Sequence, residues 1–239
     1  MGRLFGTDGA RGVANTELSC ETAMAIGRAA AMVLAEAEHH KPKVVIGKDT
    51  RISSDMLEAA LVAGFCSVGA DVLLLGVLPT PAVAYLVKAY GADAGVMISA
   101  SHNPCEYNGI KIFNSEGYKL SDALEEEIEA IVLDGAKTPP CPTGGDIGRV
   151  SSCKNAVDDY VRHLLSVTDV DLRGMRLAVD CANGSASATA RKLFSALGAD
   201  CVFLSDQPDG VNINENCGST HIEQLADFVK KLKYFAGVA

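Results

Sequence analysis

Residues 43–51 read KVVIGKDTR and residues 68–76 read VGADVLLLG. Each stretch contains a short run of branched aliphatic residues, and a helical stretch capped by Ser53 or Ser54 separates the two runs. A strand, a helix and a second strand in this order form a right-handed unit whose two strands are parallel. These residues therefore predict an α/β protein.

The same pattern recurs later in the chain, as LAVDCANG at residues 177–184 and LGADCVFLS at residues 197–205. The repetition indicates two similar α/β domains, although a Gly-Ala-Asp turn between helix and strand is common enough to recur by chance. Residues 134–149 read DGAKTPPCPTGGDIGR and show no periodicity, which is typical of a linker. We therefore predict a first domain at 1–140 and a second at 150–239.

Capping residues and apolar runs predict the remaining elements. Ser19 and Ser121 are placed to cap helices, and Pro81 stands at a first helical position. We predict helices at 19–38, 53–68, 80–90, 121–133 and 153–167, one that ends near 197 and one that begins near 219. We predict strands at 43–47, 71–75, 95–99, 109–113, 176–180 and 201–205, and one more in the last ten residues.

Composition excludes several classes of function. The formal net charge is −9, so there is no basic surplus for nucleic-acid binding as a main role. The eight cysteines form no CxxC pair, which predicts reduced thiols in a cytoplasmic protein and no zinc site. We find no signal peptide and no apolar run near the roughly 18 residues that span a bilayer, so no membrane partner is expected.

The loop after the strand at 95–99 carries the chemistry. It reads ASHNP at residues 100–104 and continues to Lys111. A phosphoryl carrier needs an exposed hydroxyl at the carboxyl end of a strand, positive charge around the phosphoryl group, and a proton acceptor. The sequence predicts that four residues of this short loop supply these groups: Ser101, His102, Asn103 and Lys111. The alternative is a plain turn, since Ser, Asn and Pro are also good turn residues. A hydrolase triad is disfavoured because no G-x-S-x-G elbow is present.

Five motifs in matching order resemble the α-D-phosphohexomutase superfamily. They are FGTDGARG at 5–12, GKDTR at 47–51, LPTPAVAYL at 78–86, ISASHNP at 98–104 and NGIKI at 108–112. Within that superfamily, the Asp in FGTDG and DGVNINENCGSTH at 209–221 resemble the amino-sugar branch. The resemblance implies two similar three-layer α/β/α domains with mixed sheets, the second of them incomplete.

The resemblance also implies an activity. Members of that branch interconvert glucosamine 6-phosphate and glucosamine 1-phosphate through a phosphoserine and a bisphosphate intermediate, which feeds UDP-N-acetylglucosamine and peptidoglycan precursor synthesis. Ser101 matches the phosphorylated serine and one ligand of a Mg²⁺ ion. His102, Lys111 and Arg11 match residues near that serine, with acid/base or electrostatic roles.

Four side chains also have simpler, structural interpretations. His102 could instead pack the loop, and Arg11 could be a solvated turn arginine. Arg51 could serve only as a helix-capping or salt-bridging residue, and Asp180, at the end of a strand, is expected to be structural.

One family motif is missing from these 239 residues: the metal loop Asp-Gly-Asp-x-Asp-Arg. Ser101 is then the only expected Mg²⁺ ligand, and Mg²⁺ needs near-octahedral oxygen coordination. We therefore expect an N-terminal half of the family's chain with little or no turnover of its own. The alternatives are a phosphoglucomutase/phosphomannomutase and a non-catalytic fragment that forms a homodimer.

Overall fold

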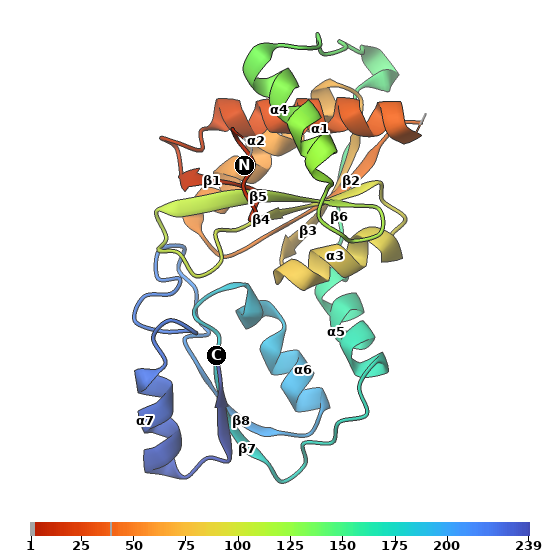
Figure 1. Cartoon of the computed structure of the whole chain (residues 1–239). Coiled ribbons are helices and arrows are strands. Elements are labelled where there is room, and N and C mark those ends of the chain that lie inside the picture. The colour runs from red at the N-terminus through yellow and green to blue at the C-terminus, as the bar shows by residue number, and fades with distance from the viewer. Residues whose placement is uncertain (1–2, 39) are drawn as a thin grey trace.

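The computed structural model describes residues 3–38 and 40–239. Figure 1 shows a larger unit with a mixed sheet above a smaller unit with a second sheet. The first sheet has the strand order β1-β5-β4-β2-β3-β6. Its strands are β1 (Ala10–Val13), β2 (Lys43–Lys48), β3 (Asp71–Val77), β4 (Ala94–Ile98), β5 (Tyr107–Asn114) and β6 (Val150–Ser152). β2 runs parallel to β3 and β4, whereas β5 is antiparallel to both β1 and β4.

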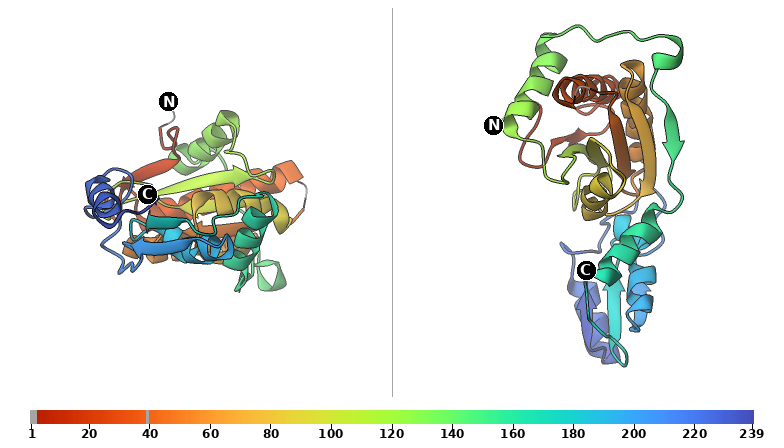
Figure 2. Two further views of the ribbon diagram at one scale, coloured as in Figure 1. Left: turned by 90° about the horizontal axis from the view of Figure 1, so that it is seen from below. Right: turned by 90° about the vertical axis from the view of Figure 1, so that its right-hand side faces the viewer.

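Helices cover both faces of this sheet, which makes three layers (Figures 1 and 2). One face carries α1 (Cys20–Glu38), α2 (Ile52–Ser67) and α4 (Asp122–Asp134), and the other carries α3 (Thr80–Ala89) and α5 (Ala156–Ser166). Along β2 the side chains alternate between the two cores: Val44 and Ile46 pack with α1 and α2, whereas Val45 packs with α3. The expected α/β/α architecture is therefore confirmed for the first unit.

Two of the predicted helix caps are present and one is wrong. The Ser19 hydroxyl accepts a hydrogen bond from the Thr22 amide at 3.2 Å, and Ser121 accepts one from the Leu124 amide at 3.4 Å. Neither serine at 53–54 caps α2, which begins at Ile52 without a side-chain cap. The buried Ser54 hydroxyl instead donates to Asp49 at 3.0 Å.

The second sheet has the order β8-β7-β9 among the described residues. β7 (Arg176–Asp180) lies between β8 (Asp200–Leu204) and β9 (Ala236–Val238), and both pairings are parallel, so the mixed pairing expected of this sheet is not seen in these strands. α6 (Ala190–Ala196) and α7 (Glu223–Leu232) lie on opposite sides of it (Figure 1). Its buried core is small and centres on Leu177, Val179, Cys181 and Ala190.

In the second unit, a short 3₁₀ turn, η2 (Ser185–Ala188), precedes α6. The predicted linker is mostly irregular and contains another such turn, η1 (Gly144–Asp146). The chain then returns to the first sheet, because β6 pairs in parallel with β3. Residues 150–152 therefore belong to the first sheet and not to the second unit. Gly148 permits this return: a β-carbon there would lie 1.9 Å from the Ala70 carbonyl oxygen.

β1 was not predicted, because its four residues ARGV lie within a glycine-rich motif and show no apolar alternation. In the described part of the chain, no helix has both the length and the apolar character needed to cross a bilayer.

Candidate active site

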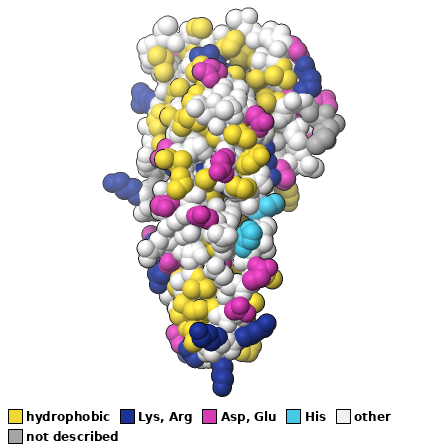
Figure 3. Space-filling view, turned by 90° about the vertical axis from the view of Figure 1, so that its left-hand side faces the viewer, with side chains coloured by type: hydrophobic (Ala, Val, Ile, Leu, Met, Phe, Trp, Pro, Cys, Tyr) yellow, Lys and Arg dark blue, Asp and Glu magenta, His cyan; other side chains and the backbone are white. Residues whose placement is uncertain are grey.

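A cavity of about 360 Å³ lies where the carboxyl ends of β2, β4 and β7 meet. Ligands of open α/β sheets bind at this edge. Both units contribute to the cavity, whose lining includes Asp49, Ser99, Ser101, His102, Asp180 and Asn214. Outside the cavity lining, Lys and Arg side chains gather at the lower end of the molecule (Figure 3). At this end α7 carries Lys230 and Lys231 in its last turn.

Ser101 and His102 lie together at this edge, as the sequence predicts. Both are exposed and line the cavity. Ser101 has a left-handed backbone with φ of 57°, a conformation that costs a residue other than glycine roughly 1–3 kcal/mol. Its amide donates to the Ser99 hydroxyl at 3.1 Å, and the Asn103 amide donates to the Ala100 carbonyl at 3.2 Å. Further contacts must hold this strained loop in place.

Arg51 supplies such contacts from beneath the loop. Its side chain is fully buried, with 0% exposed. One terminal nitrogen, Nη2, donates to the Ser101 carbonyl at 3.0 Å and to the Asn103 carbonyl at 2.8 Å, and Nη1 donates to the Pro104 carbonyl. A planar guanidinium suits this task because it presents several N–H donors in a fixed fork.

Asp49 balances the buried charge of Arg51. One carboxylate oxygen accepts from Arg51 Nε at 2.9 Å, and the other accepts from the Arg51 amide at 3.1 Å and from Ser54. A buried charge is tolerated only when it is paired and hydrogen-bonded, and both conditions are met here. The salt-bridge interpretation of Arg51 is thus confirmed, and the side-chain cap is not formed.

The second unit reaches the same loop through Asn214. Its Nδ2 atom donates to the Ser101 carbonyl and to the Asn103 carbonyl, both at 3.0 Å. Asp180, which ends β7, accepts hydrogen bonds from the Ala182 and Gly218 amides at 2.9 and 2.8 Å. It therefore shapes the loops around Asn214, in agreement with the structural role expected of it.

Arg11 on β1 is paired with Gly109 of β5, two residues before Lys111, so Arg11 and Lys111 lie on the same face of neighbouring strands. Neither lines the cavity. Lys111 is paired with Met97, which precedes Ser101 by four residues, a span of about 13 Å of extended chain. Paired residues share a sheet face, so Lys111 and Met97 lie on the α3 side of the sheet.

The surroundings of these two cations are only partly polar. Burial lowers the pKa of Lys111, the charge of Arg11 lowers it further, and Asp8 opposes the change. Arg11 pairs with Asp8 at 3.3 Å, and its Nε is buried without a hydrogen-bond partner among the described residues. Its side chain is only 22% exposed, so the interpretation as a solvated turn arginine is wrong.

The described residues do not by themselves form a magnesium site. No group of three or more His, Cys, Asp or Glu side chains that could hold a metal ion occurs among residues 3–38 and 40–239. The two carboxylates of the cavity, Asp49 and Asp180, are already occupied by internal hydrogen bonds. Ser101 remains the single candidate ligand from this chain.

Comparison with known proteins identifies the class. Residues 2–138 match the model of phosphoglucomutase/phosphomannomutase, alpha/beta/alpha domain I. The chain belongs to the phosphoglucomutase/phosphomannomutase family. The structure of a family protein from Burkholderia thailandensis has a TM-score of 0.78 at 30% identity, over 96% of this chain and 50% of that one.

Curated relatives give a narrower resemblance. The phosphoglucosamine mutase of Clostridium novyi is 58% identical over 100% of this chain and 53% of its own length. That of Acetivibrio thermocellus is 59% identical over 96% of this chain and 51% of its own length. The chain thus spans about half the length of the curated relatives it matches.

Sequence reasoning did not assign several cavity-lining residues to the site, among them Asp49, Ser99 and Asn214. Each of these three lies inside a motif quoted above, but neither its burial nor its long-range partner could be read from the motif. Asn214 contacts a loop 113 positions earlier in the chain, so the available signal was the asparagine-rich stretch NINEN at residues 212–216.

Proposed function

We propose that this chain carries the phosphoserine of a phosphoglucosamine mutase, an isomerase that interconverts glucosamine 6-phosphate and glucosamine 1-phosphate in the cytoplasm. The observation that carries the proposal is the position of Ser101. It stands exposed at the carboxyl edge of β4, on a left-handed backbone held by buried Arg51. The names of the relatives that match the full chain support the amino sugar as substrate.

The proposed step balances as a phosphoryl transfer. The bond between phosphorus and Ser101 Oγ breaks as a bond forms between phosphorus and a hydroxyl oxygen of the sugar monophosphate. The proton of that hydroxyl passes to a base, and the conjugate acid of that base gives a proton to Ser101 Oγ, which becomes a hydroxyl again. His102 is the candidate base, since it lies beside Ser101 at the cavity. The resulting bisphosphate returns its other phosphoryl group to Ser101.

Arg11 and Lys111 are proposed to act electrostatically. Both are cations on the sheet face that leads toward the cavity, and positive charge there favours binding of a dianionic phosphate. Members of the family generally depend on Mg²⁺, which neutralises charge on the transferring group. Because the described residues offer only Ser101 as a ligand, we expect this chain alone to accept phosphate with little turnover.

The test is phosphate incorporation at Ser101. The purified chain is incubated with glucosamine 1,6-bisphosphate and examined by intact-protein mass spectrometry and peptide mapping. We expect one phosphate, lost in Ser101→Ala and retained in Ser115→Ala, a serine outside the cavity lining. No incorporation into the unmodified chain, or equal incorporation into both variants, would overturn the proposal.

A second arm tests the sugar. The same incubation with glucose 1,6-bisphosphate should be slower, and faster incorporation from it would favour the phosphoglucomutase/phosphomannomutase alternative. Light scattering of the same samples tests whether the chain forms a homodimer.

A further inference from the structure

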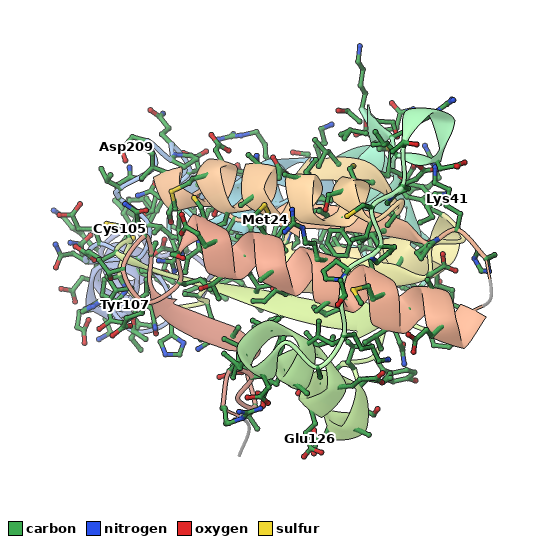
Figure 4. The ribbon with its side chains drawn as sticks, turned by 90° about the horizontal axis from the view of Figure 1, so that it is seen from above. Met24, Lys41, Cys105, Tyr107, Glu126 and Asp209 are labelled. Atoms are coloured by element: carbon green, nitrogen blue, oxygen red, sulfur yellow. The ribbon has the colours of Figure 1, made fainter. Side chains whose placement is uncertain are left out.

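The loop at residues 209–214 ties the second unit to the first. The Ile52 amide, at the start of α2, donates to the Gly210 carbonyl at 2.8 Å. Thr50 Oγ1 donates to the Asn183 carbonyl at 2.6 Å, and Asn183 in turn donates to the Asn212 carbonyl at 3.3 Å. Figure 4 shows Asp209 of this loop at the same end of the molecule as Cys105 and Tyr107, which follow the Ser101 loop.

Asn214 makes a different kind of contact, because it binds the Ser101 loop itself. Its amide nitrogen has two hydrogens, one for each of the carbonyls of Ser101 and Asn103. Arg51 Nη2 also has two hydrogens and donates to the same two carbonyls. Each carbonyl has two lone pairs, so four donor hydrogens meet four acceptor sites. One donor group comes from each unit.

The position of Asn214 is itself well determined. The backbone amide of Asn214 donates to the Ala182 carbonyl at 2.9 Å, and the neighbouring Ile213 is buried. The Ala182 amide in turn donates to Asp180 at the end of β7. A continuous chain of contacts therefore runs from the second sheet to the Ser101 carbonyl.

We propose that Asn214 is a positioning residue that fixes the backbone of the phosphate-accepting loop from the second unit. This inference rests on the proposed function and adds to it a residue that acts through the Ser101 loop, since both side-chain donor hydrogens of Asn214 bind carbonyls of that loop. A left-handed serine needs external contacts to persist. With Asn214 removed, Arg51 alone holds the two carbonyls, and the Ser101 hydroxyl samples more orientations.

The experiment compares three variants of the full chain. Asn214→Ala removes the two donor hydrogens. Asn216→Ala is the matched control, because Asn216 is exposed, lies two residues beyond Asn214 in the same connection between β8 and α7, and has a similar left-handed backbone, with φ of 54° against 59° for Asn214. Thr50→Val removes a contact between the units that does not involve the Ser101 loop.

Two readouts are taken from each variant. The first is amide hydrogen exchange in a peptide covering residues 99–107. The second is the rate of phosphate incorporation from glucosamine 1,6-bisphosphate, measured over a range of concentrations.

For Asn214→Ala we expect about tenfold faster exchange and an about tenfold lower maximal rate, because two hydrogen bonds are lost. The bisphosphate concentration that gives half the maximal rate should change less than about twofold, since both donor hydrogens that the substitution removes bind the Ser101 loop. Both control variants should match the unmodified chain. Should Asn214→Ala fail to fold, Asn214→Gly gives the same readouts without backbone strain.

Equal exchange in the Asn214 and Asn216 variants would overturn the inference, as would an effect of Asn214→Ala confined to the half-maximal concentration. If the unmodified chain takes no phosphate while exchange still separates the variants, the proposed function fails and the positioning of the loop by Asn214 stands.

Discussion

Arg51→Met should be among the most destabilising single changes in the chain. The substitution removes a fully buried cation and leaves the carboxylate of Asp49, only 2% exposed, without its charged partner. It also removes the guanidinium donors from the carbonyls of Ser101, Asn103 and Pro104. Breaking one partner of a buried ion pair costs about 3–5 kcal/mol. We expect the free energy of unfolding to fall by that amount.

Urea unfolding followed by far-ultraviolet circular dichroism measures this loss, since the chain contains no tryptophan for fluorescence. With a slope of about 2.5 kcal/mol per molar urea, the midpoint should fall by about 1–2 M. Arg173→Met is the matched control. Arg173 binds Asp171 with the same two-residue spacing and at 2.9 Å between Nε and the carboxylate, but its side chain is 81% exposed. The loss of unfolding free energy in Arg173→Met should be much smaller than in Arg51→Met, because water and salt screen an exposed ion pair. Similar losses in the two variants would refute the argument from burial.

Two further predictions concern titration. Burial alone would raise the pKa of Glu129, but hydrogen bonds from the amides of residues 3–5 hold this pKa below its ordinary value. The charged Glu129 carboxylate therefore stabilises the folded chain fully above about pH 4.5, and this contribution is lost as pH falls through the lowered pKa. Glu129→Gln should therefore lose about 1.5–3 kcal/mol at pH 7 and less at pH 3 by urea unfolding, and a constant difference would contradict this. Lys111 should deprotonate below its ordinary pKa of about 10.4 in an NMR titration. Arg11→Met should raise that pKa and Asp8→Asn should lower it, and an unchanged Lys111 in both variants would contradict the assigned causes.

The long elements could be predicted because their signals are local. Both βαβ units, the caps at Ser19 and Ser121 and the strand before Ser101 were read from apolar periodicity and capping residues alone. Each of these depends on residues within one or two turns of chain. Ser101 and His102 were found for the same reason, since one motif contains them both.

The short edge strands could not be predicted, because long-range pairing defines them. β1 has four residues and β6 has three, and neither shows alternation that would separate a strand from a turn. The same limit applies within the site. The motif GKDTR does not indicate that the Arg51 side chain is buried and donates to three carbonyls about fifty residues later in the chain. Only the folded chain brings these groups together.

The bond between Asn214 and the Ser101 loop also has a consequence for synthesis of the chain. The two partners are 113 positions apart, and a ribosome that adds about 5–20 residues per second needs roughly 6–20 s to cover that interval. The six strands of the first sheet can all emerge in this time, because the last of them ends at Ser152. The nascent first unit therefore folds with Arg51 donating to the carbonyls of Ser101 and Asn103 before Asn214 is available. The hydrogen bonds from Asn214 to the Ser101 and Asn103 carbonyls form only when the second unit emerges and docks.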